Sequence, residues 1–211
     1  VTSATAATRT GAGSATAGMT EQLILANPTS NWVTAHISYL TTSGQIIPQT
    51  VGIPGLSRLV VSANSVVQQA THATMIVANG PIVAERQDFF NIANGTHGST
   101  TVMGASESSL AWYFAHGSTA TGITASLAIA NPGAVTATVQ VVYYQARGAP
   151  IIKTYTLQGN SRFTINMMND VGINNTVGVA IYATTPIAVE QTTFFNANGI
   201  SGGYSSMGFG V

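Results

Sequence analysis

The segment Pro81-Ile82-Val83-Ala84-Glu85 recurs in the second half of the chain as Pro186-Ile187-Ala188-Val189-Glu190. Four further segments recur in the same order at an almost constant offset. They are Leu25-Ala26-Asn27-Pro28 with Ile129-Ala130-Asn131-Pro132, Ser57-Arg58-Leu59 with Ser161-Arg162-Phe163, Phe89-Phe90-Asn91 with Phe194-Phe195-Asn196, and Met103-Gly104 with Met207-Gly208. Collinear self-similarity indicates a duplicated structural unit. The sequence predicts an N-terminal arm (1–20) and two tandem repeats (21–106 and 107–211), joined near the polar stretch 106–109.

Apolar and small polar residues alternate within both repeats. The first repeat has apolar residues at Val33, Ala35, Ile37 and Tyr39, and the second has the same period of two over residues 135–141. This period is typical of half-buried strands, and turn signals such as Asn-Pro and Asn-Gly follow roughly every 8–12 residues. Residues 65–70 and 169–173 are the places where a single helical turn is expected. The predicted fold is therefore all-β, with two tandem immunoglobulin-like β-sandwich domains of about seven or eight strands each.

Charge is scarce in this chain. Of the 211 residues, 6% are charged and the formal net charge is zero, where an ordinary domain carries roughly a quarter charged residues. Low self-repulsion favours association with other copies. Six scattered Lys and Arg argue against nucleic acid as a partner, no apolar run has membrane-spanning length, and the absence of cysteine excludes thiol chemistry. No cofactor or metal is expected, and a first residue other than Met suggests a processed, secreted chain.

One strand of the second repeat is aromatic, Trp112-Tyr113-Phe114-Ala115-His116-Gly117. The order of motifs resembles a tandem β-sandwich repeat of bacterial secreted and cell-surface proteins. In that repeat an aromatic strand of this kind is followed by an Asn-Pro turn, a Ser-Arg turn, a Pro-Ile-Val-Ala-Glu strand and a glycine-rich tail. The resemblance covers about residues 23–211 and implies a structural module outside the cell. His116 and Gln191 depart from the pattern, which usually has Glu and Arg there.

The first repeat has no aromatic strand of its own. Its matching segment lies near residues 8–13, among Ala, Thr and Gly. A sandwich that lacks a strand exposes backbone groups and an apolar groove, which a strand from a neighbouring molecule can fill. One hypothesis is that the arm joins adjacent subunits, and the other is that it is a flexible or locally folded terminus. The arm residues assigned to subunit contacts are Val1, Thr2, Ala4, Ala6, Ala7, Thr8 and Thr10.

Charged residues kept by the repeat suggest structural ion pairs. Arg58 is predicted to pair with Glu85, and Arg162 with Glu190, because buried charges are tolerated when they are paired. The histidines at 36, 72, 97 and 116 lack metal-ligand spacing, and neither a nucleophile elbow nor a phosphate loop is present. The sequence therefore nominates no catalytic, cofactor or metal site, and the protein is not expected to be an enzyme.

The remaining features bear on the surface. Two sequons would permit glycosylation of Asn94 and Asn174. Aromatic residues could also form a sugar-stacking platform, the candidates being Trp32, Tyr143, Tyr144 and Tyr204. Most of them fall on alternating strand positions, so the simpler interpretation is that they are core or interface residues. The expected function is a subunit of an extracellular, pilus-like filament of identical copies, assembled by β-strand donation through the arm and a groove at the aromatic strand Trp112, Tyr113 and Phe114. The alternative is a cell-surface adhesin or carbohydrate-binding module.

Overall fold

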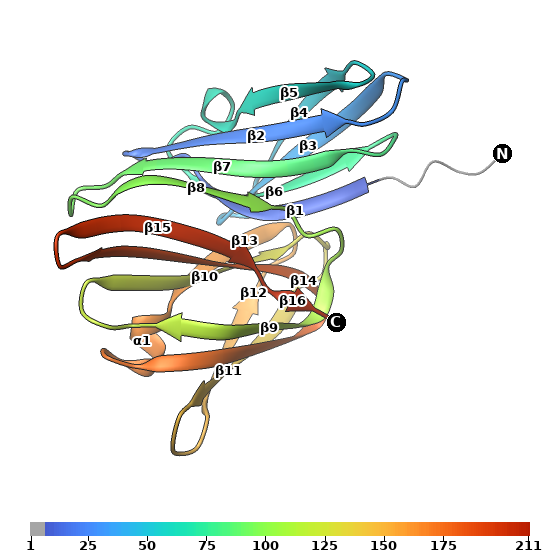
Figure 1. The fold of residues 1–211 in the computed structure, drawn as a ribbon. Coiled ribbons are helices and arrows are strands. Elements are labelled where there is room, and N and C mark those ends of the chain that lie inside the picture. Colours follow the sequence, from blue (N-terminus) through green and yellow to red (C-terminus); the bar gives the residue numbers. More distant parts are fainter. Residues whose placement is uncertain (1–6) are drawn as a thin grey trace.

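The fold is all-β and resembles a β-sandwich. A computed structural model describes residues 7–211, with 66% of residues in strands and 4% in helices (Figure 1). The N-terminal half has two four-stranded sheets. One sheet runs in the order β1 (Ala7–Ser14), β6 (Thr71–Ala78), β3 (Val33–Thr41), β4 (Ile46–Ile53), and the other in the order β5 (Ser57–Ser62), β2 (Met19–Asn27), β7 (Val83–Asn91), β8 (His97–Met103). A 3-10 turn, Ala63–Ser65, follows β5.

The C-terminal half repeats this arrangement around one long strand. Its elements are β9 (Ser109–Ser118), β10 (Ile123–Asn131), β11 (Ala137–Gln145), β12 (Ile151–Leu157), β13 (Ser161–Asn166), α1 (Met167–Val171), β14 (Thr176–Ala197), β15 (Ile200–Met207) and β16 (Phe209–Gly210). The first part of β14 pairs with β9 and β11, and its second part pairs with β10 and β15. β14 therefore belongs to both sheets, whereas the loop 79–82 separates its counterparts β6 and β7.

Each half buries its own apolar cluster. The alternation predicted for residues 33–39 is confirmed, because Val33, Ala35, Ile37 and Tyr39 all lie in the first cluster. The second cluster is built around Leu127, Ile129 and Tyr143 and also contains the indole of Trp112. Two cores, one in each half of the sequence, are consistent with the duplication, while the tandem-domain boundaries themselves stay a prediction.

The repeated Asn-Pro motif acts as a buried turn clamp in both halves. Asn27 donates from Nδ2 to the carbonyls of Asn31, Ile53 and Pro54 and accepts from the Thr29 N–H. Asn131 donates to the carbonyls of Val135 and Leu157 and accepts from the Gly133 N–H. Since a buried backbone carbonyl needs a donor, this motif ties the end of β2 or β10 to the turns that face it.

Part of the N-terminal segment is a strand of the first half. Residues 7–14 form β1, an antiparallel partner of β6 in the same molecule, with Thr10 opposite Met75 and Gly13 opposite His72. β1 thus occupies in the first half the position that β9 occupies in the second. The first half does have an edge strand, because main-chain hydrogen bonds form without large side chains. Of the arm residues assigned to subunit contacts, Ala7, Thr8 and Thr10 lie in β1, and Val1, Thr2, Ala4 and Ala6 lie outside the described residues.

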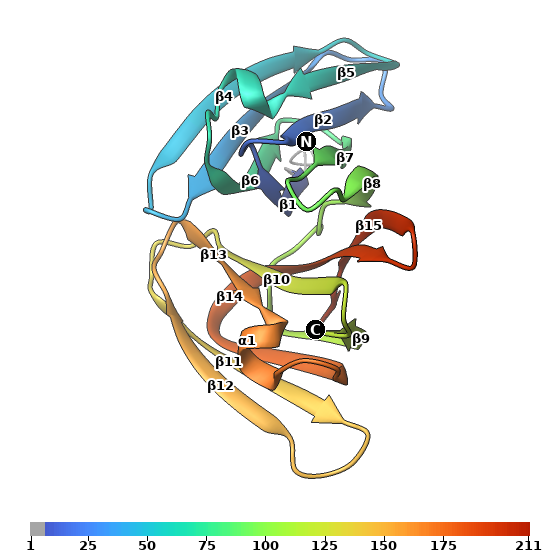
Figure 2. The same cartoon turned by 90° about the vertical axis from the view of Figure 1, so that its left-hand side faces the viewer.

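The two halves stack edge to face (Figure 2). The first half brings its β1 and β8 edge down onto the outer face of the β13-β10-β14-β15 sheet. β1 contacts β10 and β14, and β8 runs beside β15. Leu40, Ala73 and Ala130 form a small apolar cluster across this junction. The open side of the first sandwich is therefore closed by a sheet of the second half.

Candidate functional site

Much of the charge of this charge-poor chain is buried at that junction. Along β7 the buried side chains alternate, at Ala84, Arg86, Asp88 and Phe90. Glu21 on β2 lies directly opposite Asp88, so both carboxylates share one face of the sheet. Alternation places these residues on the inner face, and the open edge of the first sandwich turns them toward the second half. In β7 the charged residues Arg86 and Asp88 therefore lie at buried positions of the kind that Ala84 and Phe90 occupy.

Arg86 links the two halves. Its Nη1 and Nη2 donate to the two carboxylate oxygens of Glu190 at 2.9 and 2.5 Å, and its Nε donates to Asp88 Oδ2 at 2.9 Å. All three side chains are almost completely buried. Planar two-point pairing of this kind fixes geometry as well as charge. Breaking a buried pair is costly, so Arg86 and Glu190 specify how the two halves dock.

A second polar pair lies beside the first. His72 Nε2 is 3.2 Å from Glu21 Oε1, and both side chains are fully buried. The ring of His72 packs edge-on against Tyr39, with ring centroids 5.1 Å apart. Burial raises the pKa of the Tyr39 hydroxyl, and the charge of Glu21 raises it further. Tyr39 therefore stays neutral and acts as a hydrogen-bonding group, donating to Gln49.

Burial and neighbouring charges shift the pKa values of three groups in this cluster, Asp88, Arg86 and Arg162. Burial raises the pKa of Asp88 to about 7, assisted by the charges of Glu21 and Glu190 and opposed by Arg86. Burial opposes the charge of Arg86, but Glu190 and Asp88 outweigh this effect and raise the Arg86 pKa. Burial lowers the pKa of Arg162 to about 10, with Glu190 only partly compensating. Arg86 is thus fully compensated, whereas Arg162 is not.

The structure corrects one of the two predicted ion pairs, Arg58 with Glu85. Arg58 is exposed and Glu85 half-buried on the outer side of their sheet, and no salt bridge joins them within residues 7–211. Glu190 is ion-paired with Arg86 of the other half, and Arg162 lies close enough to feel its charge. Tandem repeats were expected to pair internally. The junction also brings Glu190 within reach of Arg86 of the first half, whose equivalent in the second half is Gln191.

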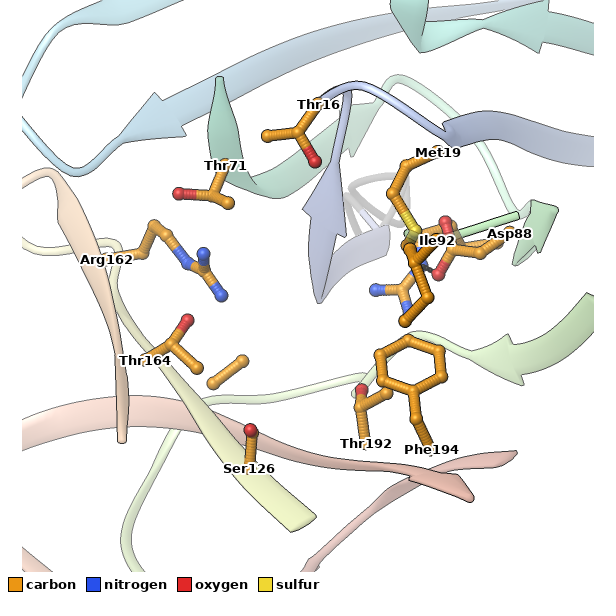
Figure 3. Close-up of a pocket in the computed structure, with 12 residues that line it drawn as sticks. Thr16, Met19, Thr71, Asp88, Ile92, Ser126, Arg162, Thr164, Thr192 and Phe194 are labelled. Carbon is orange, nitrogen blue, oxygen red and sulfur yellow. Dashed lines mark hydrogen bonds and ion pairs between the residues drawn. The ribbon is translucent and has the colours of Figure 1, made fainter. Parts of the chain in front are cut away.

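An open cavity of about 270 Å³ lies against this cluster, between the halves (Figure 3). The first half contributes residues of β2, β6 and β7 and adjacent loops, and the second half contributes residues of β10, β13 and β14. The lining residues are Thr16, Met19, Thr71, Arg86, Asp88, Ile92, Ser126, Ala128, Arg162, Thr164, Thr192 and Phe194. The cavity combines two guanidinium groups, one carboxylate and several hydroxyls with an apolar wall.

The other predicted site residues lie apart from this cavity. In β9, Trp112 and Phe114 point into the second core and Tyr113 points outward; the Trp112 indole donates to the Ile187 carbonyl at 2.8 Å. The aromatic strand is therefore packed in its own half, although Trp112 and Ser109 also line an open hollow together with residues 103–107, 207, 208 and 210. Asn94 and Asn174 lie in exposed turns.

The predicted sugar-stacking residues are not gathered on one surface. Tyr143 lies in the second core and donates to Asp170, while Trp32, Tyr144 and Tyr204 are exposed on different elements. Within the described residues, no group of three or more His, Cys, Asp or Glu could hold a metal. No helix in residues 7–211 is long and apolar enough to cross a membrane.

Sequence reasoning missed Glu21, His72, Arg86 and Asp88. The second repeat replaces three of them by Ala125, Gln191 and Thr193, so a search for repeated residues passes over them. A usable signal was present, since charges at the buried phase of an alternating strand are expensive unless they are paired.

No protein-family model and no curated protein matches the chain. A Thermotoga maritima protein designated 1070 is similar in structure over 49% of this chain and 96% of its own, at 13% identity and a TM-score of 0.47. The Anabaena sensory rhodopsin transducer matches 40% of this chain and 95% of its own, at 17% identity and a TM-score of 0.37. The PBSX exported protein XepA covers 88% of this chain and 84% of its own, at 10% identity and a TM-score of 0.30. At these values the likenesses support no functional inference.

Proposed function

We propose that this protein is a non-enzymatic structural subunit that assembles head to tail with copies of itself into an extracellular, pilus-like filament. The finer form of the proposal is that its two halves are tandem immunoglobulin-like domains. The observation that carries the proposal is an exposed sheet face in the first half. Its counterpart in the second half is buried, because the first half covers it.

The exposed face is the outer side of the β5-β2-β7-β8 sheet. Strand register places Arg58 and Val83 beside Ala26, and Val60 and Glu85 beside Ile24, all on this side. Its exposed apolar residues are Val60, Val83, Phe89 and Met103. Exposed apolar patches mark interaction sites. The equivalent side of the second half is the one that the first half covers, so a surface of this type is suited to receiving a sandwich edge.

The edge that would dock onto this face belongs to the second half of another copy. Within one molecule, the docking edge consists of β1 and β8. Its counterpart in the second half consists of β9 and β15, with β16 alongside β9, and it exposes Leu110, Tyr204 and Phe209. Stacking this edge on the outer face of the next subunit repeats the internal contact between molecules. A contact between two different surfaces does not close on itself and generates an open fibre.

Strand donation is the second part of the proposal. β1 forms a backbone ladder with β6 along its whole length, and residues 15–18 connect it to β2. Because main-chain hydrogen bonds do not depend on side-chain identity, β1 of one copy can make the same pairings with β6 of the next. Exchanging β1 would link subunits without any new interface.

Complementary surface variants test the assembly. Phe89→Asp alters the receiving face and Phe209→Asp alters the docking edge, so each variant alone should stay monomeric in analytical ultracentrifugation. Mixed together, they should form dimers and no longer species, because each retains one intact surface. Ile152→Asp, an exposed apolar site on β12, is the control and should assemble like the unaltered protein. Unchanged fibres from both single variants would refute head-to-tail stacking.

Cysteine pairs test strand donation in a chain that has no cysteine of its own. Thr10 and Met75 are register partners, as are Ala111 and Tyr182, and the Cα spacing of antiparallel partners allows a disulfide. Oxidised Thr10→Cys/Met75→Cys fibres should run as covalent multimers on a non-reducing gel if β1 is exchanged. The Ala111→Cys/Tyr182→Cys control should run as monomers. Monomers from both variants would show that β1 stays in its own subunit.

A further inference from the structure

The cavity between the halves contains a buried cation with spare hydrogen-bonding capacity. Arg162 lies on β13 and is about as buried as a core residue, yet its Nε has no hydrogen-bond partner. Figure 3 shows its guanidinium group directed from the β13 side into the cavity, between Thr71 and Thr164. A guanidinium group has five donors in a fixed fork. A buried guanidinium group whose charge is not fully balanced by carboxylates is costly. Arg162 is therefore suited to bind an anion that enters from solvent.

The second guanidinium of the cavity is already engaged. Arg86 donates to Glu190 and Asp88, so its charge is neutralised by the protein itself. Asp88 uses only Oδ2 in this contact, and its buried Oδ1 has no partner. Asp88 lies across the cavity from Arg162 (Figure 3). The cavity therefore offers an anion-binding group on one side and a free acceptor on the other.

The rest of the lining narrows the class of ligand. Hydroxyl groups of Thr71, Ser126 and Thr164 lie along the wall near Arg162, while Met19, Ile92 and Phe194 form an apolar wall near Asp88. Carboxylates of Glu21, Asp88 and Glu190 surround the cluster, and their negative charge disfavours a multiply charged anion such as phosphate. A volume of about 270 Å³ limits the occupant to a small molecule.

We propose that this cavity binds a small carboxylate that also carries a hydrogen-bond donor. The carboxylate pairs with the Arg162 guanidinium, and the ligand's hydroxyl or ammonium group donates to Asp88 Oδ1. Because the lining comes from both halves, the ligand bridges them. The site is independent of filament assembly and is present in a single subunit.

The test compares simple anions on the intact protein. Lactate carries a carboxylate and a hydroxyl, acetate carries only the carboxylate, sulfate is a different anion, and 1,2-propanediol lacks the charge. Each is titrated at constant ionic strength while the Arg162 Nε–H resonance and the melting temperature are followed. Lactate should shift both, acetate should bind more weakly, and sulfate and propanediol should have no saturable effect.

Arg162→Met is the matched variant, and Arg58→Met at the repeat-equivalent, exposed position is its control. The first should weaken lactate binding at least tenfold and the second should leave it unchanged. Asp88→Asn should remove the preference for lactate over acetate. Should Arg162→Met fail to fold, the resonance titration of the unaltered protein still decides. Sulfate binding as tightly as lactate, or an Arg162 signal that no carboxylate moves, would overturn the proposal.

Discussion

Arg58 and Arg162 occupy the same place in the two halves, yet their surroundings are opposite. Arg58 lies beside Ala26 and Arg162 beside Ala130, each on the outer side of its sheet. Arg58 is exposed, whereas Arg162 is 4% exposed. Glu85 and Glu190 show the same contrast, with Glu85 half-buried and Glu190 1% exposed. The fold of each half is alike, so the difference arises from what covers the sheet.

Burial of equivalent residues in this protein therefore depends on how the two halves pack against each other as well as on the repeated sequence itself. Arg58 and Glu85 lie on an uncovered outer face, whereas their equivalents Arg162 and Glu190 are part of a buried network where the first half packs against the sheet. The network is completed by Arg86 and Asp88, which the first half adds at its edge. The outer sheet face occurs in both halves, but only in the second half is it covered by a specific partner, the edge of the first half.

The largest difference between the two halves is expected when the two repeated glutamates are neutralised separately. Glu190→Gln removes the charge that compensates Arg86 and should lower the free energy of unfolding by about 3–5 kcal/mol. Glu85→Gln should change it by no more than about 0.5 kcal/mol, as a surface substitution does. Urea denaturation of both variants measures the difference. Equally small effects would mean that the ion pair between Glu190 and Arg86 does not contribute to stability.

The turn clamps should behave alike, because they are buried in both halves. Asn27→Ala and Asn131→Ala each leave two or more carbonyls without their donor and should cost about 1–3 kcal/mol. Thermal and urea unfolding of the two variants provide the comparison. A large loss for one variant with none for the other would show that the repeats differ in more than their covering.

A smaller effect is expected from pH, and only from the first half. The folded-state pKa of Asp88 is raised to about 7 from an ordinary value near 4, so folding favours its protonated form. Stability from this group is present below about pH 4 and is lost as the pH rises to about 7. The groups that share its surroundings are Glu21, His72, Arg86, Arg162 and Glu190.

The expected result is a higher melting temperature at pH 5 than at pH 8, with a smaller difference in Asp88→Asn, which resembles the protonated form. Thr193 occupies the equivalent place in the second half and does not titrate. A Thr193→Val variant should therefore keep the pH dependence of the unaltered protein. A pH response that Asp88→Asn leaves intact would assign it to another group.

Parts of this structure could be predicted from the sequence for definite physical reasons. Alternation over residues 33–39 fixes which side chains face the core, and the Asn-Pro repeats mark where strands end. β1 is harder to predict, because residues 7–14 are mostly Ala, Thr and Gly and carry no apolar alternation, although they form a full backbone ladder with β6. The partner of Glu190 could not be deduced either, since it depends on how two folded halves dock.

β14 runs unbroken through both sheets of the second half, from Thr176 to Ala197. At about 3.3 Å per residue its contour length is roughly 70 Å, with a pairing irregularity between Tyr182 and Ile187. The two sheets cannot separate without breaking the pairing of this strand with its neighbours. In the first half the loop 79–82 interrupts the same path. If the molecule is stretched from its two ends, we expect the first half to unfold at a lower force than the second.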